Sequence, residues 1–133
     1  MYNFSEKSQS KINECHKDIQ TICDYLIKFI DFTVITGYRS PAEQLEKVKQ
    51  GLSKVKVSKH NSNPSMAIDI APYPIDWKDR ERFYFLAGYF LGTAKMLKEQ
   101  GKIKHDVRSG CDWDRDGEIN DNKFDDLGHF ELI

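Results

Sequence analysis

Hydrophobic residues recur at steps of three and four in two long stretches of the chain, which is the spacing of one helical face. In the first stretch they are Ile19, Ile22, Cys23, Leu26 and Ile30. In the second they are Phe83, Leu86, Ala87, Phe90, Ala94 and Leu97. Asp76 can cap the second helix, and Gly101 follows its end. The pattern therefore predicts two amphipathic helices.

A third helix is predicted by the residues at its boundaries. Ser40 suits the N-cap, Pro41 the first helical position and Glu43 the third, and together they make a capping box. We expect this helix to run from Pro41 to about Gln50 and to stop at Gly51.

Three short segments have the composition of β-strands. Residues 31–37 are rich in β-branched and aromatic side chains and end in glycine. Residues 66–71 are apolar except for one acid, and prolines follow them. Residues 129–133 close the chain after a loop rich in acids. The order helix, strand, helix, strand, helix, strand predicts one α+β domain over residues 1–133, with a small sheet.

Composition excludes several classes of protein. The chain has 20 basic and 21 acidic residues and a net charge of −1, unlike the strongly basic proteins that bind nucleic acids in general. No stretch approaches the roughly 18 uncharged apolar residues of a membrane helix. Three cysteines fit neither a disulfide framework nor a CxxC metal knuckle. We therefore expect no nucleic acid as partner and no membrane insertion, and a monomer is the default expectation.

The acid inside a predicted strand is the first sign of a functional site. Asp69 lies between Ile68 and Ile70, so strand alternation places it on the opposite face from both. Simple exposure to water is one explanation, because half-buried strands alternate in this way. His60 lies upstream across a turn, however, and His129 starts the last strand. Two histidines, one carboxylate and one free position are the ligand set of a catalytic zinc site.

A second carboxylate, Asp126, lies three residues before His129 and is available to take a proton from water. His16 and His105 are expected to be surface or capping residues. Spacing alone does not decide between a zinc site and histidines of this ordinary kind, because the chain has no HExxH helix.

Three motifs, SKH at 58–60, AID at 67–69 and DLGH at 126–129, resemble the SxH, AxD and (D/E)xxH signature of the M15 metallopeptidases. This D-alanyl-D-alanine carboxypeptidase-like family includes phage endolysins that cleave the L-alanyl-D-glutamate bond. The TGYRS run at 36–40 and the CDWD run at 111–114 also resemble the endolysin branch. The resemblance covers nearly the whole chain. It implies a hedgehog/DD-peptidase-like fold, with helices packed on a small antiparallel sheet.

The resemblance implies that Zn²⁺ is held by His60, Asp69 and His129. Zinc lowers the pKa of its bound water to about 7, which supplies hydroxide at neutral pH. Asp126 is implied as the general base, which takes the proton of the water and later gives it to the departing amine.

The resemblance also assigns roles to Arg39 and Ser58. Arg39, at the end of the first strand, is the implied cation that stabilises the oxyanion, and a surface salt bridge is the alternative. Ser58 is expected to hydrogen-bond the substrate or a ligand. The family pattern SxHxxGxAxD is shorter than this sequence between its His and Asp. We therefore expect the extra residues between His60 and Asp69 to bulge outward and leave both ligands in place.

The loop before the last strand resembles part of a calcium site. Residues 112–120 read DWDRDGEIN, with acids at positions one, three and five and glycine at six, as in an EF-hand. Lys123 stands at position twelve, where an EF-hand has a bidentate Glu, so a complete EF-hand is excluded. A solvated acidic turn is the alternative, but such closely spaced carboxylates repel one another without a cation. The candidate Ca²⁺ ligands are Asp112, Asp114 and Asp116, with Asp121, Asn120 or the Glu118 carbonyl to complete a weaker site.

The predicted function is a zinc-dependent endopeptidase of bacterial peptidoglycan, an endolysin that cleaves the L-Ala–D-Glu bond and responds to calcium. A D-Ala-D-Ala carboxypeptidase or dipeptidase of the same fold is one alternative. A non-catalytic zinc- and calcium-binding module is another, although a structural site does not need the spare base Asp126. The N-terminus has no apolar signal segment. We therefore expect synthesis in the host cytoplasm and action on the cell wall after release.

Overall fold

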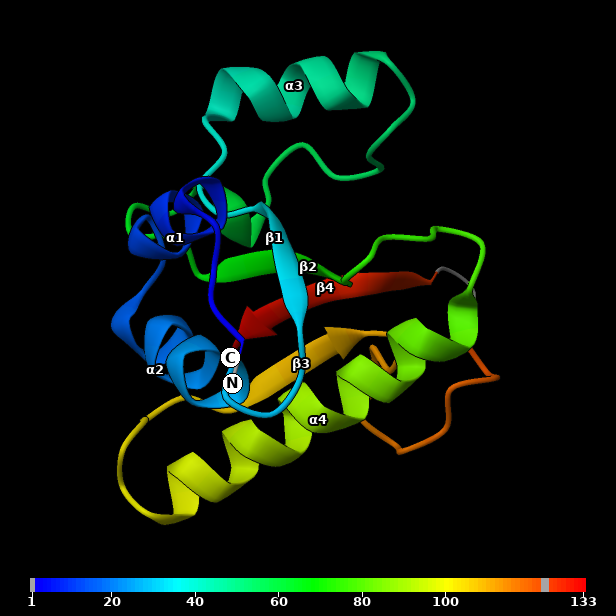
Figure 1. The fold of residues 1–133 in the computed structure, drawn as a ribbon. Helices are drawn as coiled ribbons and strands as arrows, with labels where there is room; N and C mark the ends of the chain where they lie inside the picture. The colour runs from blue at the N-terminus through cyan, green and yellow to red at the C-terminus, as the bar shows by residue number, and fades with distance from the viewer. Residues whose placement is uncertain (1, 123–124) are drawn as a thin grey trace.

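A four-stranded antiparallel sheet with strand order β1-β2-β4-β3 forms the centre of the computed structural model, which describes residues 2–122 and 125–133 (Figure 1). In chain order the strands are β1 (Phe32–Thr36), β2 (Ala67–Pro72), β3 (Val107–Gly110) and β4 (Asp126–Leu132). All neighbouring strands pair antiparallel. The predicted α+β class with a small antiparallel sheet is therefore confirmed.

Four α-helices and one short 3₁₀-helix surround the sheet in the part of the chain that the structure describes. They are α1 (Glu6–Asn13), α2 (Lys17–Leu26), α3 (Pro41–Lys49), η1 (Lys59–Asn61) and α4 (Arg80–Glu99). The long helix α4 crosses one face of the sheet, whereas α3 stands apart from it at the top of Figure 1. None of the described helices combines the length and hydrophobicity that a membrane span requires.

The core lies between α4, α2 and one face of the sheet. Phe130 of β4 stacks on Phe90 of α4 with ring centroids 4.2 Å apart, and both side chains are fully buried. Ile68 and Ile70 of β2 face the same core. Burying each of these side chains contributes on the order of 1.5–3 kcal/mol. The alternate residues of β2 and β4 are thereby directed to the other face of the sheet, which carries the polar chemistry.

The predicted capping box at the start of α3 is present. Ser40 Oγ accepts a hydrogen bond from the backbone N–H of Glu43, and the Glu43 carboxylate accepts one from the Ser40 N–H. Asp76 does not cap α4, so that prediction is wrong. The N-cap is Asp79, whose carboxylate accepts from the Arg82 N–H, whereas Asp76 accepts from Lys78 in the preceding turn. Two aspartates three residues apart can each close a turn, and sequence spacing does not separate them.

Strand β3 was not anticipated, and the last strand begins earlier than residue 129. Residues 107–110 read VRSG, without an apolar alternation, and they are extended because they pair with β4. Asp126, predicted in the acidic loop, is the first residue of β4. Gly128 lies against β2, where an added Cβ would be only 2.4 Å from the Ile70 carbonyl oxygen. Glycine there permits the close approach of the two central strands.

Candidate active site

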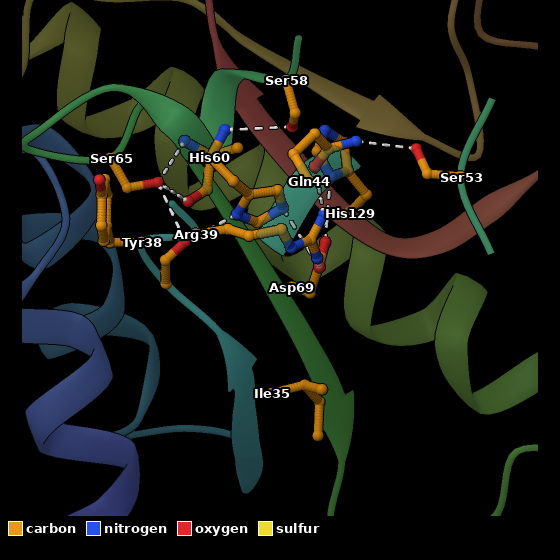
Figure 2. A network of polar contacts seen from close by, with 12 residues as sticks. Ile35, Tyr38, Arg39, Gln44, Ser53, Ser58, His60, Ser65, Asp69 and His129 are labelled. Carbon is orange, nitrogen blue, oxygen red and sulfur yellow. Dashed lines mark hydrogen bonds and ion pairs between the residues drawn. The ribbon is translucent and has the colours of Figure 1, made fainter. Parts of the chain in front are cut away.

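The structure brings His60, Asp69 and His129 together on the polar face of the sheet (Figure 2). Asp69 in β2 is the register partner of His129 in β4, and His60 comes from η1. Asp69 Oδ2 lies 3.2 Å from His60 Nε2, and Asp69 Oδ1 lies 3.0 Å from His129 Nδ1. One ligand atom from each residue lies within 4.8 Å of the other two. The carboxylate thus joins two imidazoles.

The ring of His60 is held so that one nitrogen faces Asp69. Its side chain is 2% exposed, and Nδ1 donates to the Gly37 carbonyl at 2.7 Å. Nε2 is buried and, among residues 2–122 and 125–133, finds no hydrogen-bond partner of good geometry. Buried polar atoms are normally satisfied, so such a nitrogen beside two other ligand groups fits a site built for a metal ion. Two imidazoles and one carboxylate suit zinc.

His129 has carboxylates at both ring nitrogens. Besides the contact of Nδ1 with Asp69, its Nε2 lies 2.9 Å from Glu131 Oε1. Glu131 is 7% exposed and forms an ion pair with Arg108 at 2.6 Å. Glu131 was not singled out from the sequence. The signal was there, because residues i and i+2 of a strand share one face.

Mutual contacts shift the pKa values of these groups. Burial would raise the pKa of Asp69, but its hydrogen bond with His129 and the close contact with His60 hold this pKa well below its usual range. Burial would lower the pKa of His129, but its hydrogen bonds with Asp69 and Glu131 raise it to about 9. Burial and the nearby charge of Asp69 raise the pKa of Asp126, which brings this base closer to neutrality.

Arg39 is fixed beside the cluster by a buried glutamine. Its Nη2 lies 3.7 Å from Asp69 Oδ2, and its Nη1 donates to Gln44 Oε1 at 2.8 Å. Gln44 in α3 is fully buried, and its Nε2 donates to Ser53 Oγ and to the Val55 carbonyl at 2.9 and 2.7 Å. Gln44 thus ties Arg39 to the loop that follows α3. Nothing in the local sequence marks Gln44, because all three of these partners lie outside its helix.

Ser58 caps the short helix that carries His60. Its hydroxyl accepts a hydrogen bond from the His60 backbone N–H at 3.2 Å. The following turn contains the extra residues, and 62–64 are exposed. Ser65 returns to the interior, where its hydroxyl donates to the Ala67 carbonyl. The turn therefore bulges outward, as expected, while His60 and Asp69 stay in contact.

These residues line a cleft of about 580 Å³ between the sheet, α3 and the loop after it. Asp126 lies in the cleft, as do the basic side chains of Lys47, Lys59 and Arg108. A second hollow, of about 600 Å³ between α2 and α4, is lined by aromatic residues and by no charged group. A pocket with convergent polar groups and perturbed pKa values is the better candidate for an active site.

The acidic loop folds around its own carboxylates. Asp112 accepts from the N–H groups of Asp116 and Gly117, and Asp114 accepts from Asp116. Ligand oxygens of these three aspartates lie within 4.8 Å of one another. The hydrogen bond with Asp116, followed by burial and nearby charge, raises the pKa of Asp121 to about 6. Lys123, the residue that excludes a complete EF-hand, lies outside the described residues.

One side chain links this loop to the histidine cluster. The ring of Trp113 is 5.5 Å from the His129 ring and 5.7 Å from the Arg108 guanidinium. Trp113 stands between Asp112 and Asp114 in the chain. A change in the conformation of the acidic loop would therefore occur beside His129, a predicted zinc ligand.

The other two histidines serve the fold, as expected. His16 caps α2, with Nδ1 accepting from the Asp18 N–H. Asp18 Oδ2 accepts from the His105 ring at 2.7 Å and from the backbone N–H groups of Lys104 and His105. Asp18 therefore ties the start of α2 to the segment that leads into β3.

Comparisons with known proteins agree with the interpretation of the site geometry. A sequence model of the family described as phage L-alanyl-D-glutamate peptidase matches residues 1–133. The L-alanyl-D-glutamate peptidase of Escherichia phage T5 is 30% identical over 141 residues, covering 99% of this chain and 98% of that protein. The crystal structure of Serratia marcescens L-Ala D-Glu endopeptidase ChiX has a TM-score of 0.74 at 23% identity, covering 98% of this chain and 89% of that one. The last likeness concerns the fold.

Proposed function

Because the chain belongs to the phage L-alanyl-D-glutamate peptidase family, we propose that it is a zinc-dependent endopeptidase that cleaves the L-Ala–D-Glu bond of peptidoglycan stem peptides. The observation that carries the zinc assignment is the buried His60–Asp69–His129 cluster in a polar cleft. These three residues would hold the ion. Zinc, when bound, lowers the pKa of water and polarises a carbonyl group.

Asp126 is the proposed general base. Its side chain lines the cleft, and burial and the charge of Asp69 raise its pKa above the ordinary value of an aspartate. It would take a proton from the attacking water as the new C–O bond forms. It would then give this proton to the amine nitrogen of D-Glu as the peptide C–N bond breaks.

Arg39 is the proposed cation for the developing oxyanion. Its guanidinium lies near the cluster, and Gln44 fixes its direction before substrate arrives. A preorganised cation of this kind needs no reorganisation during the reaction. Ser58 is proposed to hydrogen-bond the substrate or a ligand, since its hydroxyl lies beside His60 and accepts from the His60 backbone N–H.

We further propose that Ca²⁺ binds the loop of Asp112, Asp114 and Asp116, with Asp121 nearby, and that it modulates activity. The clustered carboxylates and the contact of Trp113 with His129 support this proposal. Zinc-loaded protein should change its rate of peptidoglycan cleavage when calcium is raised from micromolar to millimolar, roughly the range of such loops. An unchanged rate over that range would rule the calcium proposal out.

Digestion of purified peptidoglycan, with products identified by mass spectrometry, tests the main proposal. We expect stem peptides that begin at D-Glu, their loss with a chelator and their return with zinc. Release of D-Ala alone would instead place the protein among the carboxypeptidases. No cleavage with zinc and calcium both supplied would favour a binding module.

A further inference from the structure

Glu131 occupies a position from which it can orient a metal ligand. It lies two residues after His129 on the same face of β4, while Phe130 and Leu132 point into the core. Its register partners are Ala67 on β2 and Arg108 on β3. The small side chain of Ala67 leaves room for the Glu131 carboxylate on one side. On the other side, Arg108 forms a cross-strand ion pair with it.

The hydrogen bond of Glu131 occupies one of the two ring nitrogens of His129. An ionised carboxylate only accepts hydrogen bonds, so the His129 Nε2 must donate to Glu131 Oε1, 2.9 Å away. When the ring binds a metal ion as a neutral imidazole, the other nitrogen, Nδ1, then carries the lone pair. Nδ1 is the nitrogen directed at Asp69, and hence at the centre of the cluster.

His60 shows the complementary arrangement. Its Nδ1 donates to the Gly37 carbonyl, which leaves Nε2 facing Asp69. The two histidines therefore present opposite nitrogens to the same point, and in each the second nitrogen is held by an acceptor. For His60 this acceptor is a backbone carbonyl, whereas for His129 it is the side chain of Glu131, which a substitution can remove.

Glu131 is itself held in place. Arg108 Nη2 contacts Glu131 Oε2 at 2.6 Å, and Lys59 Nζ lies 3.8 Å from the same oxygen. Lys59 also donates to the Leu132 carbonyl. The Arg108 guanidinium in turn lies against the ring of Trp113. One carboxylate oxygen is thus fixed by cations and the other is left for His129.

We propose that Glu131, anchored by Arg108, is a positioning residue that selects the His129 tautomer with Nδ1 as the metal-binding atom. The inference rests on the proposed zinc site. Partners of this kind raise metal affinity because the ring of the ligand is already oriented before the metal arrives.

The test is a zinc titration of metal-free protein against a chromogenic chelator. Glu131→Leu should bind zinc about 10- to 100-fold more weakly than the wild type. Glu131→Gln keeps an acceptor oxygen and should recover most of that loss. Asp106→Leu is the matched control, because it removes an ion-paired carboxylate whose partners are Lys98 and Arg115, and it should bind zinc like the wild type.

Long-range ¹H–¹⁵N spectra of the zinc-loaded wild type provide a second readout that a purely structural role would not affect. We expect His129 to be protonated at Nε2 and His60 at Nδ1, so the two rings serve as references for each other. A proton on Nδ1 of His129 would overturn the proposal, even if Glu131→Leu did not fold.

Wild-type zinc affinity in a folded Glu131→Leu variant would also overturn it, and would leave the proposed function intact. A wild type that cleaves peptidoglycan but binds no zinc would overturn this inference together with the zinc assignment. Circular dichroism of each variant separates loss of the ligand geometry from loss of the fold.

Discussion

Replacement of Gln44 by methionine tests whether this buried glutamine positions Arg39, the proposed cation of the active site. Methionine has nearly the shape of glutamine but cannot replace its hydrogen bonds. The change removes the acceptor of Arg39 and the donor to Ser53 and Val55, from a side chain that is fully buried.

The expected magnitude follows from these three bonds. Each contributes a net of about 1 kcal/mol, which gives an upper value of about 3 kcal/mol for the loss of unfolding free energy. Arg39 and Ser53 can recover hydrogen bonds from water because both are partly exposed, so we expect a loss of about 1–3 kcal/mol. A guanidinium displaced by about 1 Å should lower kcat/KM by roughly 10- to 100-fold.

Urea denaturation and cleavage of purified peptidoglycan measure the two effects separately. Gln50→Met is the control, since the side chain of this exposed glutamine at the end of α3 bonds Glu46 on the helix surface, and it should change stability by less than about 0.5 kcal/mol. If Gln44 acts through Arg39, adding Gln44→Met to Arg39→Met should lower activity no further. A loss of about 1–3 kcal/mol in unfolding free energy with unchanged kcat/KM would refute the reasoning. Fully additive effects of Gln44→Met and Arg39→Met on activity would refute it as well.

Three further tests separate the effects of substitutions on catalysis from their effects on the fold. Asp126→Asn should keep its zinc content and lose about 10²- to 10⁴-fold in activity, whereas His129→Ala should lose both zinc and activity. Metal analysis of the purified variants checks this, and a zinc-free Asp126→Asn would make Asp126 a ligand. Asp18→Asn should lower stability by about 1–3 kcal/mol at pH 7. Although burial opposes it, hydrogen bonding lowers the pKa of Asp18, so its contribution is present above about pH 4 and is lost in acid; denaturation curves of both proteins should converge as the pH falls. Gly128→Ala should weaken zinc binding because its Cβ would meet β2. Apart from the neighbouring backbone of its own helix, a Cβ added at Gly92 would have no described atom within 4 Å, so Gly92→Ala should stabilise α4 by about 0.4–1 kcal/mol. Equal zinc affinities of the two variants would contradict the role given to strand spacing.

The features that the sequence predicts well depend on neighbouring residues. The capping box at Ser40 and Glu43 is complete within one helical turn. The acid within residues 66–71 departs from an otherwise apolar strand, and this departure marks it before any partner is known. Such signals survive in a single sequence because the interacting groups lie close along the chain.

The features that it misses depend on partners far along the chain. Strand β3 has no apolar pattern and exists because β4 pairs with it. Gln44 is a polar helix residue like any other until its contacts with Arg39 and Val55 are seen. Strand alternation places Glu131 on the same face as His129, but a carboxylate in a last strand can equally face water, and the ion pair with Arg108 decides that it does not. Tertiary pairing decides each of these cases.

The predicted zinc ligands His60, Asp69 and His129 are brought together by the positions of the backbone segments that carry them. Asp69 and His129 meet because β2 and β4 pair in a fixed register, and Gly128 sets the distance between those strands. His60 is held at the end of β1, where the Gly37 carbonyl accepts from its ring and the Arg39 N–H donates to its carbonyl.

Gly37 can lie there because it has no Cβ, which would stand 2.4 Å from the Lys11 carbonyl of α1. The packing of α1 on β1 therefore determines the position of His60, a predicted zinc ligand. None of these backbone constraints requires a bound ion, whereas some small domains fold only when zinc is bound. Removal of zinc should consequently abolish cleavage while the far-ultraviolet circular dichroism spectrum stays that of the folded protein. Unfolding on chelation would show instead that the metal holds the strands together.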